Sequence, residues 1–408
     1  MKLLKVHSVT ETKNIIDSML YKSWDFFEEI HVEESIGRVV FEDVYSSIEL
    51  PENTKSVVDG YALKSKDTIG AGESMPVFLD VLGHIKMGKN TDIEVTNNTA
   101  VYVPTGALIP EGADGVVMIE YVENLDKDTI AVYTPIAVGE GMIEKGDDIK
   151  KGDTILAKGK RIGAVDIAVL CAVGIEKIKV YKKLRLSVIS TGDEIVDSFG
   201  SVKIGQIRDI NTHLLASMAL ESGADVSLRL LTKDVFDDIK EAIERSFEVS
   251  DMIVISGGSS VGNKDMTVNV IKALKNGEIF VHGVAVKPGK PTIIGKVEEK
   301  AIFGLPGHPA SAMIIYKIFV DYLIKKCYSM EEEKILIEAT STENIHSAPG
   351  KETYQAVELF YKDGRYEAVP IYGKSAAISK VARSRGFICI DENKEGIKRG
   401  EKVRVELF

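Results

Sequence analysis

The sequence has few cysteines and no long apolar run. Its 408 residues include only Cys171, Cys327 and Cys389, an odd and widely spaced set without a CxxC pair. Such a set is typical of reduced thiols and argues against a disulfide framework or a cysteine-based zinc site. No stretch of about 18 uninterrupted apolar residues is present, so we expect no membrane-spanning helix.

Positive charge is also in the minority. The chain carries 51 Lys and Arg against 62 Asp and Glu, a formal balance of −11. An acidic chain is a poor electrostatic partner for nucleic acid or an anionic membrane, and we expect neither as a partner. The segment Met1–Lys5 is followed by polar residues and lacks the apolar centre of a signal peptide. Together with the reduced thiols, this predicts a cytoplasmic protein.

The residue composition changes several times along the chain. Its length of 408 residues predicts about two to four domains. Residues 8–22 begin with a capping-box pattern and continue with helical spacing of apolar residues. Residues 51–135 are rich in Val, Thr and Gly in short alternating runs, which predicts a small β domain. Residues 139–160 form a connector rich in Gly and charge, and residues 162–173 are apolar at helical spacing.

Between residues 184 and 330, apolar strands alternate with amphipathic helices. This alternation predicts an open, mostly parallel, doubly wound sheet. Strands are expected at residues 184–190, 226–231, 252–256, 280–286 and 301–305. Asn211 and Asp234 are each expected to be the N-cap of a helix, and further helices are expected after Asp265 and after Pro309. Residues 335–408 return to short strands and Gly turns, which predicts a terminal β-barrel.

Ligands of open α/β sheets bind beyond the carboxyl ends of the strands. The most informative turn there is SGGSSVGNKD, from Ser256 to Asp265. Its glycines free backbone N–H groups to face an anion, and the next helix adds its positive N-terminal end. Gly257 and Gly262 have the Walker A interval, but Asn-Lys-Asp follows and excludes a P-loop; no GxGxxG is present either. A glycine-rich turn without a ligand remains the alternative.

Two further turns at this edge are rigid. In KPGKP, the prolines restrict the directions of Lys287 and Lys290, which suits the binding of an anion. In LPGHPASA, small residues let a helix begin close to a ligand, and His308 lies in the turn. An exposed basic loop and an ordinary turn histidine are the alternatives.

Acidic residues gather at the same expected edge: Asp193, Glu194, Asp209, Asp234 and Asp265. Carboxylates beside phosphate-like groups need a mediating cation, most naturally Mg²⁺. Helix capping is the alternative for Asp209 and Asp234. The seven histidines show no HExxH spacing and no GxSxG elbow occurs, so a zinc hydrolase and a Ser-His-Asp enzyme have little support.

Two turns in the β region carry polar groups that a turn does not require. SVVDGYA contains Asp59, and TGALIPEGAD begins with Thr105. Plain β-turns are the alternative. Taken together, eight segments resemble the MoeA family, the molybdopterin molybdenumtransferases, whose eukaryotic relatives include the gephyrin E domain. The resemblance extends from about residue 8 to the C-terminus and rests on SxxDGYA, TGAxxPxGAD, GxDI (Gly146–Ile149), STGDE, GQIRDxN, GGxSxGxxD, KPGKP and LPGxP.

The resemblance implies a multi-domain α/β fold. It comprises a doubly wound, MogA-like molybdopterin-binding domain, a β domain, a mixed N-terminal and linker domain, and a C-terminal β-barrel. The expected domains are 1–48 with 140–180, then 49–139, 181–330 and 331–408. The implied activity inserts molybdate into adenylylated molybdopterin and releases AMP and molybdenum cofactor, assisted by Mg²⁺ or alternatively Zn²⁺. The implied assembly is a homodimer whose cleft lies between the doubly wound domain of one subunit and the β domain of the other. A MogA-type adenylyltransferase is a candidate partner.

The resemblance also implies roles for individual residues. The expected catalytic residues are Asp59, Thr105, Asp148, Glu194, Asp234 and Asp265, with Glu194 and Asp265 as metal ligands. The expected substrate-binding residues are Arg208, Gly257, Gly258, Ser259, Ser260, Gly262, Lys287, Lys290, Pro306, His308, Pro309 and Ser311. Of these, Arg208 and Ser260 are expected in the molybdate pocket.

The chain departs from the family pattern at a few positions. Val57-Val58 replaces Ala-Met, Ser259 replaces Val, Gly283 stands where a basic residue is common, and His308 replaces the Asn of LPGNP. The last change lies in the expected cleft, so the sequence leaves open whether molybdate or tungstate is preferred. Two alternative functions are a molybdopterin adenylyltransferase, which shares the doubly wound domain, and a non-catalytic scaffold like gephyrin.

Overall fold

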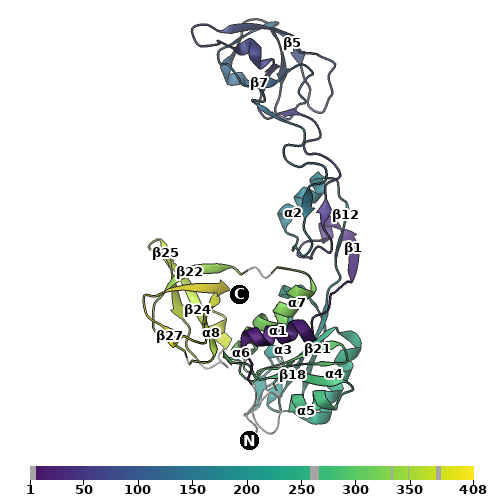
Figure 1. Ribbon diagram of the computed structural model, residues 1–408, viewed down its shortest axis with the longest axis vertical. Coiled ribbons are helices and arrows are strands. Elements are labelled where there is room, and N and C mark those ends of the chain that lie inside the picture. The colour runs from purple at the N-terminus through teal and green to yellow at the C-terminus, as the bar shows by residue number, and fades with distance from the viewer. Residues whose placement is uncertain (1–5, 258–265, 332–333, 348, 374–377) are drawn as a thin grey trace.

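The computed structural model describes residues 6–257, 266–331, 334–347, 349–373 and 378–408. The molecule is elongated, with a β domain at one end and a small connector region in the middle (Figure 1). An α/β region and a β-barrel occupy the other end. Among the helices of the described residues, none is both long and apolar enough to cross a membrane.

The β domain is one sheet of strand order β7-β4-β6-β5-β9-β8. Its strands are β4 (Gly60–Leu63), β5 (Val77–His84), β6 (Thr99–Val103), β7 (Gly115–Met118), β8 (Val122–Asn124) and β9 (Thr129–Val132). Neighbouring residues point to opposite faces, so Tyr61 and Leu63 pack in one apolar cluster while Ala62 packs in another. Both faces of the sheet are therefore covered, which confirms the expected β domain.

The connector region joins the β domain to the rest of the molecule. Its elements are β1 (Phe27–His31), β2 (Val44–Tyr45), β3 (Lys55–Ser56), β10 (Met142–Ile143), β11 (Thr154–Leu156), α2 (Ala164–Ala172) and β12 (Lys177–Tyr181). Strand β1 pairs antiparallel with β12, β2 with β11, and β3 with β10. Val32, Val40, Leu170 and Ile178 form its core. The chain thus passes through this region twice, before and after the β domain.

The α/β region is a six-stranded sheet of order β16-β13-β17-β21-β20-β18. Its strands are β13 (Arg185–Thr191), β16 (Asp225–Thr232), β17 (Met252–Ser256), β18 (Gly277–His282), β20 (Ile293–Val297) and β21 (Lys300–Leu305). Strands β16, β13, β17 and β21 are parallel, and β20 is antiparallel to β21. The predicted strand 280–286 is wrong in extent, because Gly283 at φ +105° separates β18 from β19 (Val286–Lys287).

Helices cover both faces of this sheet, as expected for a doubly wound fold. They are α1 (Val9–Met19), α3 (Asn211–Glu221), α4 (Phe236–Val249), α5 (Met266–Ala273), α6 (Pro309–Ile315), a π-helical segment (Tyr316–Val320) and α7 (Asp321–Cys327). Met252 and Val254 of β17 pack in the cluster that contains residues of α1, α3 and α6. Ile253 and Ile255 pack in the cluster that contains residues of α4 and α5.

The C-terminal region is a closed barrel. Its elements are β22 (Leu336–Ser341), β23 (Ile345–His346), β24 (Glu352–Lys362), β25 (Arg365–Pro370), α8 (Ile378–Val381), β26 (Gly386–Ile390), β27 (Gly396–Ile397) and β28 (Lys402–Leu407). The ring runs β24-β25-β22-β28-β26 and closes because β26 also pairs with β24. Strand β19 pairs with β24 and so attaches the barrel to the α/β region. The expected barrel is confirmed; the four domain boundaries stay a prediction.

Candidate active site

The four parallel strands of the α/β region end at one edge of the sheet. Thr191 lies opposite Thr232, and Ser256 lies opposite Ser190 and Leu305. The turns that follow these strands therefore lie side by side, as the strand pattern predicted. We call residues 192–194, 233–234, 257 and 306–309 the rim.

Two of these turns touch at glycines. The Gly257 N–H donates to the Leu305 carbonyl at 3.2 Å. Gly257 has φ +104°, and a Cβ there would lie 2.1 Å from the Thr191 carbonyl oxygen, so only glycine fits. A Cβ on Gly307 would lie 3.6 Å from the Gly257 Cα, which puts the two turns in contact. The predicted site residues Gly258, Ser259, Ser260, Gly262 and Asp265 lie outside the described residues.

Asn211 binds the same two turns together. Its Nδ2 donates to Ser256 Oγ at 2.8 Å and to the Gly307 carbonyl at 2.7 Å. The residue is 5% exposed, and its Oδ1 is buried without a hydrogen-bond partner among the residues that the structure describes. Sequence reasoning treated Asn211 only as a helix cap, and that was wrong, because it is the first residue of α3. Its place inside the GQIRDxN motif was the available signal.

Asp209 takes the capping role instead. Its carboxylate accepts the Thr212 backbone N–H at 3.1 Å and also the Thr212 hydroxyl. A carboxylate there satisfies an otherwise unpaired donor of the first helical turn. The capping alternative therefore holds for Asp209, which is buried at the start of α3.

Three carboxylates meet at the rim. Asp234 Oδ1 accepts the Thr191 hydroxyl at 3.3 Å, and the Asp234 N–H donates to Asp193 Oδ1 at 3.3 Å. Burial raises the pKa of Asp234, and the charges of Asp193 and Glu194 raise it further against the hydrogen bond from Thr191. The capping role expected for Asp234 is wrong, since Val235 precedes α4 and no side chain caps that helix. Its carboxylate faces the rim.

Glu194 is exposed beside this group. Its carbonyl accepts the Ile207 N–H at 2.9 Å, which fixes the short parallel pair β14 (Ile195–Val196) and β15 (Ile207–Arg208). Oxygen donors under mutual repulsion suit Mg²⁺. Among the described residues, however, no group of three or more His, Cys, Asp or Glu is arranged to hold a metal ion. The described rim thus supplies a suitable donor chemistry without a complete ligand set.

Arg208 holds its own loop. Its Nη1 donates to the carbonyls of Ser198 at 2.8 Å and Gly200 at 2.5 Å. The residue is exposed on β15. One edge of the guanidinium is therefore engaged by the loop before β15, and only its other edge could grip an oxyanion in two places.

The basic turn packs against the helix that follows the rim. Lys287 ends β19, and both Lys287 and Lys290 are exposed. A Cβ at Gly289 would lie 2.4 Å from Ile315 Cδ1, so this turn lies directly on α6. The rim turn leads into the same helix: Pro306 is buried, His308 is exposed at the N-cap, and α6 begins at Pro309, with Ser311 buried.

The β domain brings Asp59 and Thr105 together. Asp59 precedes β4 and Thr105 follows β6, which are paired strands. Asp59 Oδ1 accepts the Thr105 backbone N–H at 2.7 Å and the Thr105 hydroxyl at 3.0 Å. Both residues are exposed. Asp148 is also exposed, in the connector region, where its N–H donates to the Leu50 carbonyl at 3.0 Å.

A single chain does not join these groups to the rim. Strand β7, which pairs with β4 beside Asp59, lies at the end of the molecule opposite β21 (Figure 1). Apart from Asp148 in the connector region, the predicted site residues that the structure describes therefore form two separate clusters within one chain. These are the Asp59–Thr105 pair and the rim with its neighbouring turns.

Known proteins resemble this chain over nearly its whole length. A molybdopterin biosynthesis protein of Methanocaldococcus jannaschii is 32% identical over 389 residues, 93% of this chain and 92% of that protein. The molybdopterin molybdenumtransferase of Staphylococcus aureus is 31% identical over 380 residues, 93% of this chain and 90% of that enzyme. A crystal structure of a molybdopterin biosynthesis MoeA protein from Pyrococcus horikoshii superposes with a TM-score of 0.83 at 29% identity, covering 99% of this chain and 100% of that one.

Three family models divide the chain among them. The MoeA N-terminal region (domains I and II) matches residues 7–174. The probable molybdopterin-binding domain matches residues 187–326, the part that carries the rim. The MoeA C-terminal region (domain IV) matches residues 338–408, which form the barrel. The chain therefore belongs to the MoeA family of molybdenum cofactor biosynthesis proteins.

Proposed function

We propose that this chain is a molybdopterin molybdenumtransferase, which inserts molybdate into adenylylated molybdopterin and releases AMP and molybdenum cofactor. Relatives of that name at about 31% identity support the activity. The observation that carries the proposal is the rim, where Asn211 and the Gly257 and Gly307 turns form a tight frame beside Asp193, Glu194 and Asp234. Such an edge is where doubly wound sheets bind their ligands.

The residues at and near the rim would have different roles in substrate binding and proton transfer, according to their chemistry. Lys287 and Arg208 would attract the tetrahedral oxyanion, the lysine as a point charge and the arginine through its fork. The glycines that follow Gly257 in the sequence would offer backbone N–H groups, since the Gly257 N–H already donates to the Leu305 carbonyl. The half-buried Asp234 would exchange a proton with the substrate more readily than an ordinary carboxylate, because its pKa is raised.

The remaining predicted residues would position substrate and charge. Glu194, with Asp265, would hold Mg²⁺ or alternatively Zn²⁺, which neutralises charge on the phosphate linkage when bound. The substrate-binding set proposed for the turns is Gly258, Ser259, Ser260, Gly262, Lys290, Pro306, His308, Pro309 and Ser311. The rate enhancement would come mainly from positioning and charge stabilisation.

A homodimer would complete the site. One chain holds the Asp59–Thr105 pair and the rim at opposite ends, so we propose that each cleft combines the rim of one subunit with Asp59, Thr105 and Asp148 of the other. We also propose a cytoplasmic location. A MogA-type adenylyltransferase would be the partner that supplies the adenylylated substrate.

The two alternatives have less support. A molybdopterin adenylyltransferase would need only the doubly wound domain, whereas this chain also matches the MoeA N-terminal and C-terminal regions. A gephyrin-like scaffold without activity is not favoured, because relatives named as transferases align with 93% of the chain.

Mixing two inactive variants tests both the activity and the shared cleft. Asp59→Ala and Glu194→Ala would each abolish molybdate-dependent release of AMP from adenylylated molybdopterin. After subunit exchange, each mixed dimer would contain one intact cleft, so about a quarter of wild-type activity should return. Recovery would support the shared cleft, and inactive mixtures of exchanged dimers would contradict it. Transfer of AMP from ATP to molybdopterin would instead identify an adenylyltransferase.

A further inference from the structure

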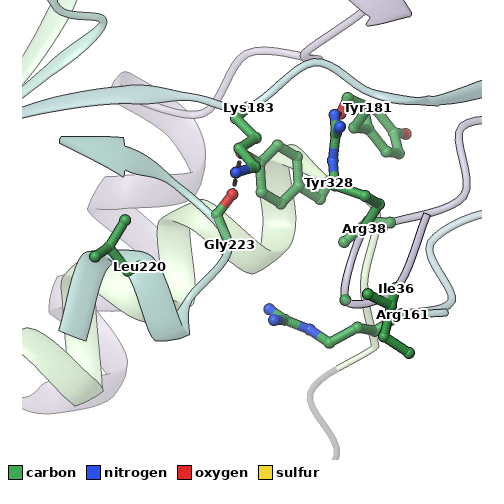
Figure 2. Close-up of a pocket in the computed structure, with 10 residues that line it drawn as sticks. Ile36, Arg38, Arg161, Tyr181, Lys183, Leu220, Gly223 and Tyr328 are labelled. Carbon is green, nitrogen blue, oxygen red and sulfur yellow. Dashed lines mark hydrogen bonds between the residues drawn. The ribbon is translucent and has the colours of Figure 1, made fainter. Parts of the chain in front are cut away.

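A cavity of about 230 Å³ lies where the connector region meets the α/β region (Figure 2). The connector side contributes Arg38, Arg161 and Tyr181. The α/β side contributes Gly223, just after α3, and Tyr328, just after α7. Asn211 begins α3 and Gly223 follows its end, so the cavity lies about 16 Å from the rim along that helix. It is a separate site.

Three cations line this cavity, and two of them have carboxylate partners. Arg38 Nη2 donates to Glu28 Oε1 at 2.5 Å and to the Tyr181 carbonyl at 2.8 Å. Lys183 Nζ lies 3.1 Å from Asp225 Oδ1. Within the described ranges, Arg161 makes no side-chain hydrogen bond or ion pair. These five charged side chains therefore leave a balance of 3 − 2 = +1, centred on Arg161.

The Arg161 guanidinium reaches across the cavity. Figure 2 shows Arg161 extending from the connector side toward the end of the helix that carries Leu220. Its Nη2 lies 3.2 Å from the position that a Cβ on Gly223 would occupy. The Gly223 carbonyl, which would repel an anion, already accepts the Tyr328 hydroxyl at 3.2 Å. The Arg161 guanidinium therefore lies close to a residue whose carbonyl already accepts a hydrogen bond from the protein.

The backbone around the arginines is held in place. The Gly37 N–H donates to the Ile162 carbonyl at 2.8 Å, and the Ile162 N–H donates to the Arg38 carbonyl at 2.9 Å. Val39 and Arg161 form an antiparallel β-bridge, which is flanked by the Ile162–Arg38 bond and by a bond from the Val40 N–H to the Lys160 carbonyl at 2.9 Å. Since this backbone is already ordered, the loss of conformational entropy in the protein on binding would be limited to the side chains.

We propose that this cavity binds a small dianionic oxyanion, either inorganic phosphate or the phosphate group of a small monoester, with Arg161 as its main ligand and Lys183 as the second. The planar guanidinium matches two phosphate oxygens at once. The volume suits a phosphate group and falls short of the several hundred Å³ of typical drug-sized pockets. Because the ligand contacts both regions, it would tie them together and raise the melting temperature.

Calorimetric titration of the full chain with inorganic phosphate tests this proposal. Lys287→Ala, which removes a cation of the proposed active site, should retain one bound phosphate. Arg161→Ala should weaken binding at least about tenfold and Lys183→Ala about threefold, since each removes a charge-assisted contact. Arg245→Ala, on the exposed face of α4, is the matched control and should bind normally.

Trp24, the single tryptophan, supplies a local readout. Its indole N–H donates to the Lys182 carbonyl at 2.6 Å, next to Lys183, so its emission should follow the same binding curve. No binding by wild type at tens of millimolar phosphate, or binding that survives Arg161→Ala, overturns the proposal. If Arg161→Ala fails to fold, Arg161→Lys is the second variant. It keeps the positive charge but lacks the planar guanidinium that can bind two oxygens at once, so it should bind phosphate more weakly than wild type. Titration with glycerol phosphate then distinguishes a monoester from free phosphate by which one binds more tightly.

Discussion

The two clusters of site residues use carboxylates in opposite ways. In the β domain, Asp59 is exposed and receives two hydrogen bonds from Thr105, so its carboxylate is oriented by donors. At the rim, Asp234 is half-buried beside Asp193 and Glu194, and its pKa is raised. The first cluster is ready to contact a ligand as it stands. The second contains a repulsion that a cation would relieve, so the two should respond differently to Mg²⁺.

Removal of either key carboxylate should have the largest effect. Glu194→Gln and Asp59→Asn should each lower the rate of cofactor formation by about a hundredfold or more, a loss typical of preorganised charge. Only Glu194→Gln should also weaken the apparent affinity for Mg²⁺ in a titration of the residual activity. Equal Mg²⁺ affinity in both variants would contradict the expectation that only the rim responds to the cation. Asp193→Asn, at the neighbouring position, is the control and should lose far less activity.

The frame of the rim should depend on Asn211. Asn211→Leu leaves the Ser256 hydroxyl and the Gly307 carbonyl with one donor fewer, and should lower the free energy of unfolding by about 1–3 kcal/mol. Urea unfolding followed by Trp24 emission measures this, because Trp24 packs against the core of the α/β region. Thr105→Ala in the β domain should leave this transition unchanged. A shift of equal size in both variants would contradict the expectation.

The orientation of Asp59 should depend on the Thr105 hydroxyl. Thr105→Val removes that donor and keeps the backbone one, so cofactor formation should fall about tenfold. Thr105→Ser keeps both donors and should remain near wild type. Initial rates of AMP release compare the two variants. Equal rates for them would show that the backbone N–H alone orients the carboxylate.

The repulsion at the rim should be visible in the pH dependence of stability. Because the folded-state pKa of Asp234 is raised above 3.8, the folded chain binds this proton more tightly than the unfolded chain. Its contribution to stability therefore falls as pH rises from 3.8 through the raised value. Asp234→Asn should melt at a higher temperature than wild type at pH 7, and the two curves should converge in acid. A lower melting temperature at pH 7 would contradict this sign.

The smallest effect is expected at His308. It lies exposed in the turn before α6, so His308→Asn should change the rate with molybdate by less than about threefold. Rates with molybdate and with tungstate, measured side by side, check this and reveal any change of preference. A large change with one oxyanion would place His308 in direct contact with it.

Local patterns predicted the elements of the fold well. The capping box at Ser8 and Glu11 starts α1 as expected, because both of its bonds form within four residues. The strands that lead to the rim were found from apolar runs bounded by turns. Strand β20 was missed, because it follows directly on the proline-rich KPGKP turn, which was interpreted as a loop.

The contacts within the site were harder to predict. Asn211 and Gly307 are 96 residues apart in the sequence, and only the finished sheet brings them together. Asp234 sits just ahead of a helix, where capping is the usual role, and the Thr191 hydroxyl that it accepts comes from another strand. The secondary-structure propensity of the residues around Asn211 or Asp234 carries no information about hydrogen-bond partners so distant in the sequence. Asp59 and Thr105, by contrast, lie beside adjacent strands of one small sheet.

The first helix of the chain, α1, is held in place by contacts with α7, which lies far later in the sequence. Asp17 of α1 accepts the Tyr322 hydroxyl, 305 residues later in the sequence, and binds Lys326 of α7. The β domain, whose strands pair only with one another, is inserted between them. During synthesis on the ribosome the β domain could fold early, whereas α1 would lack its α7 partners until nearly the whole chain had been made. An apolar face held open for that time is a natural substrate for a chaperone.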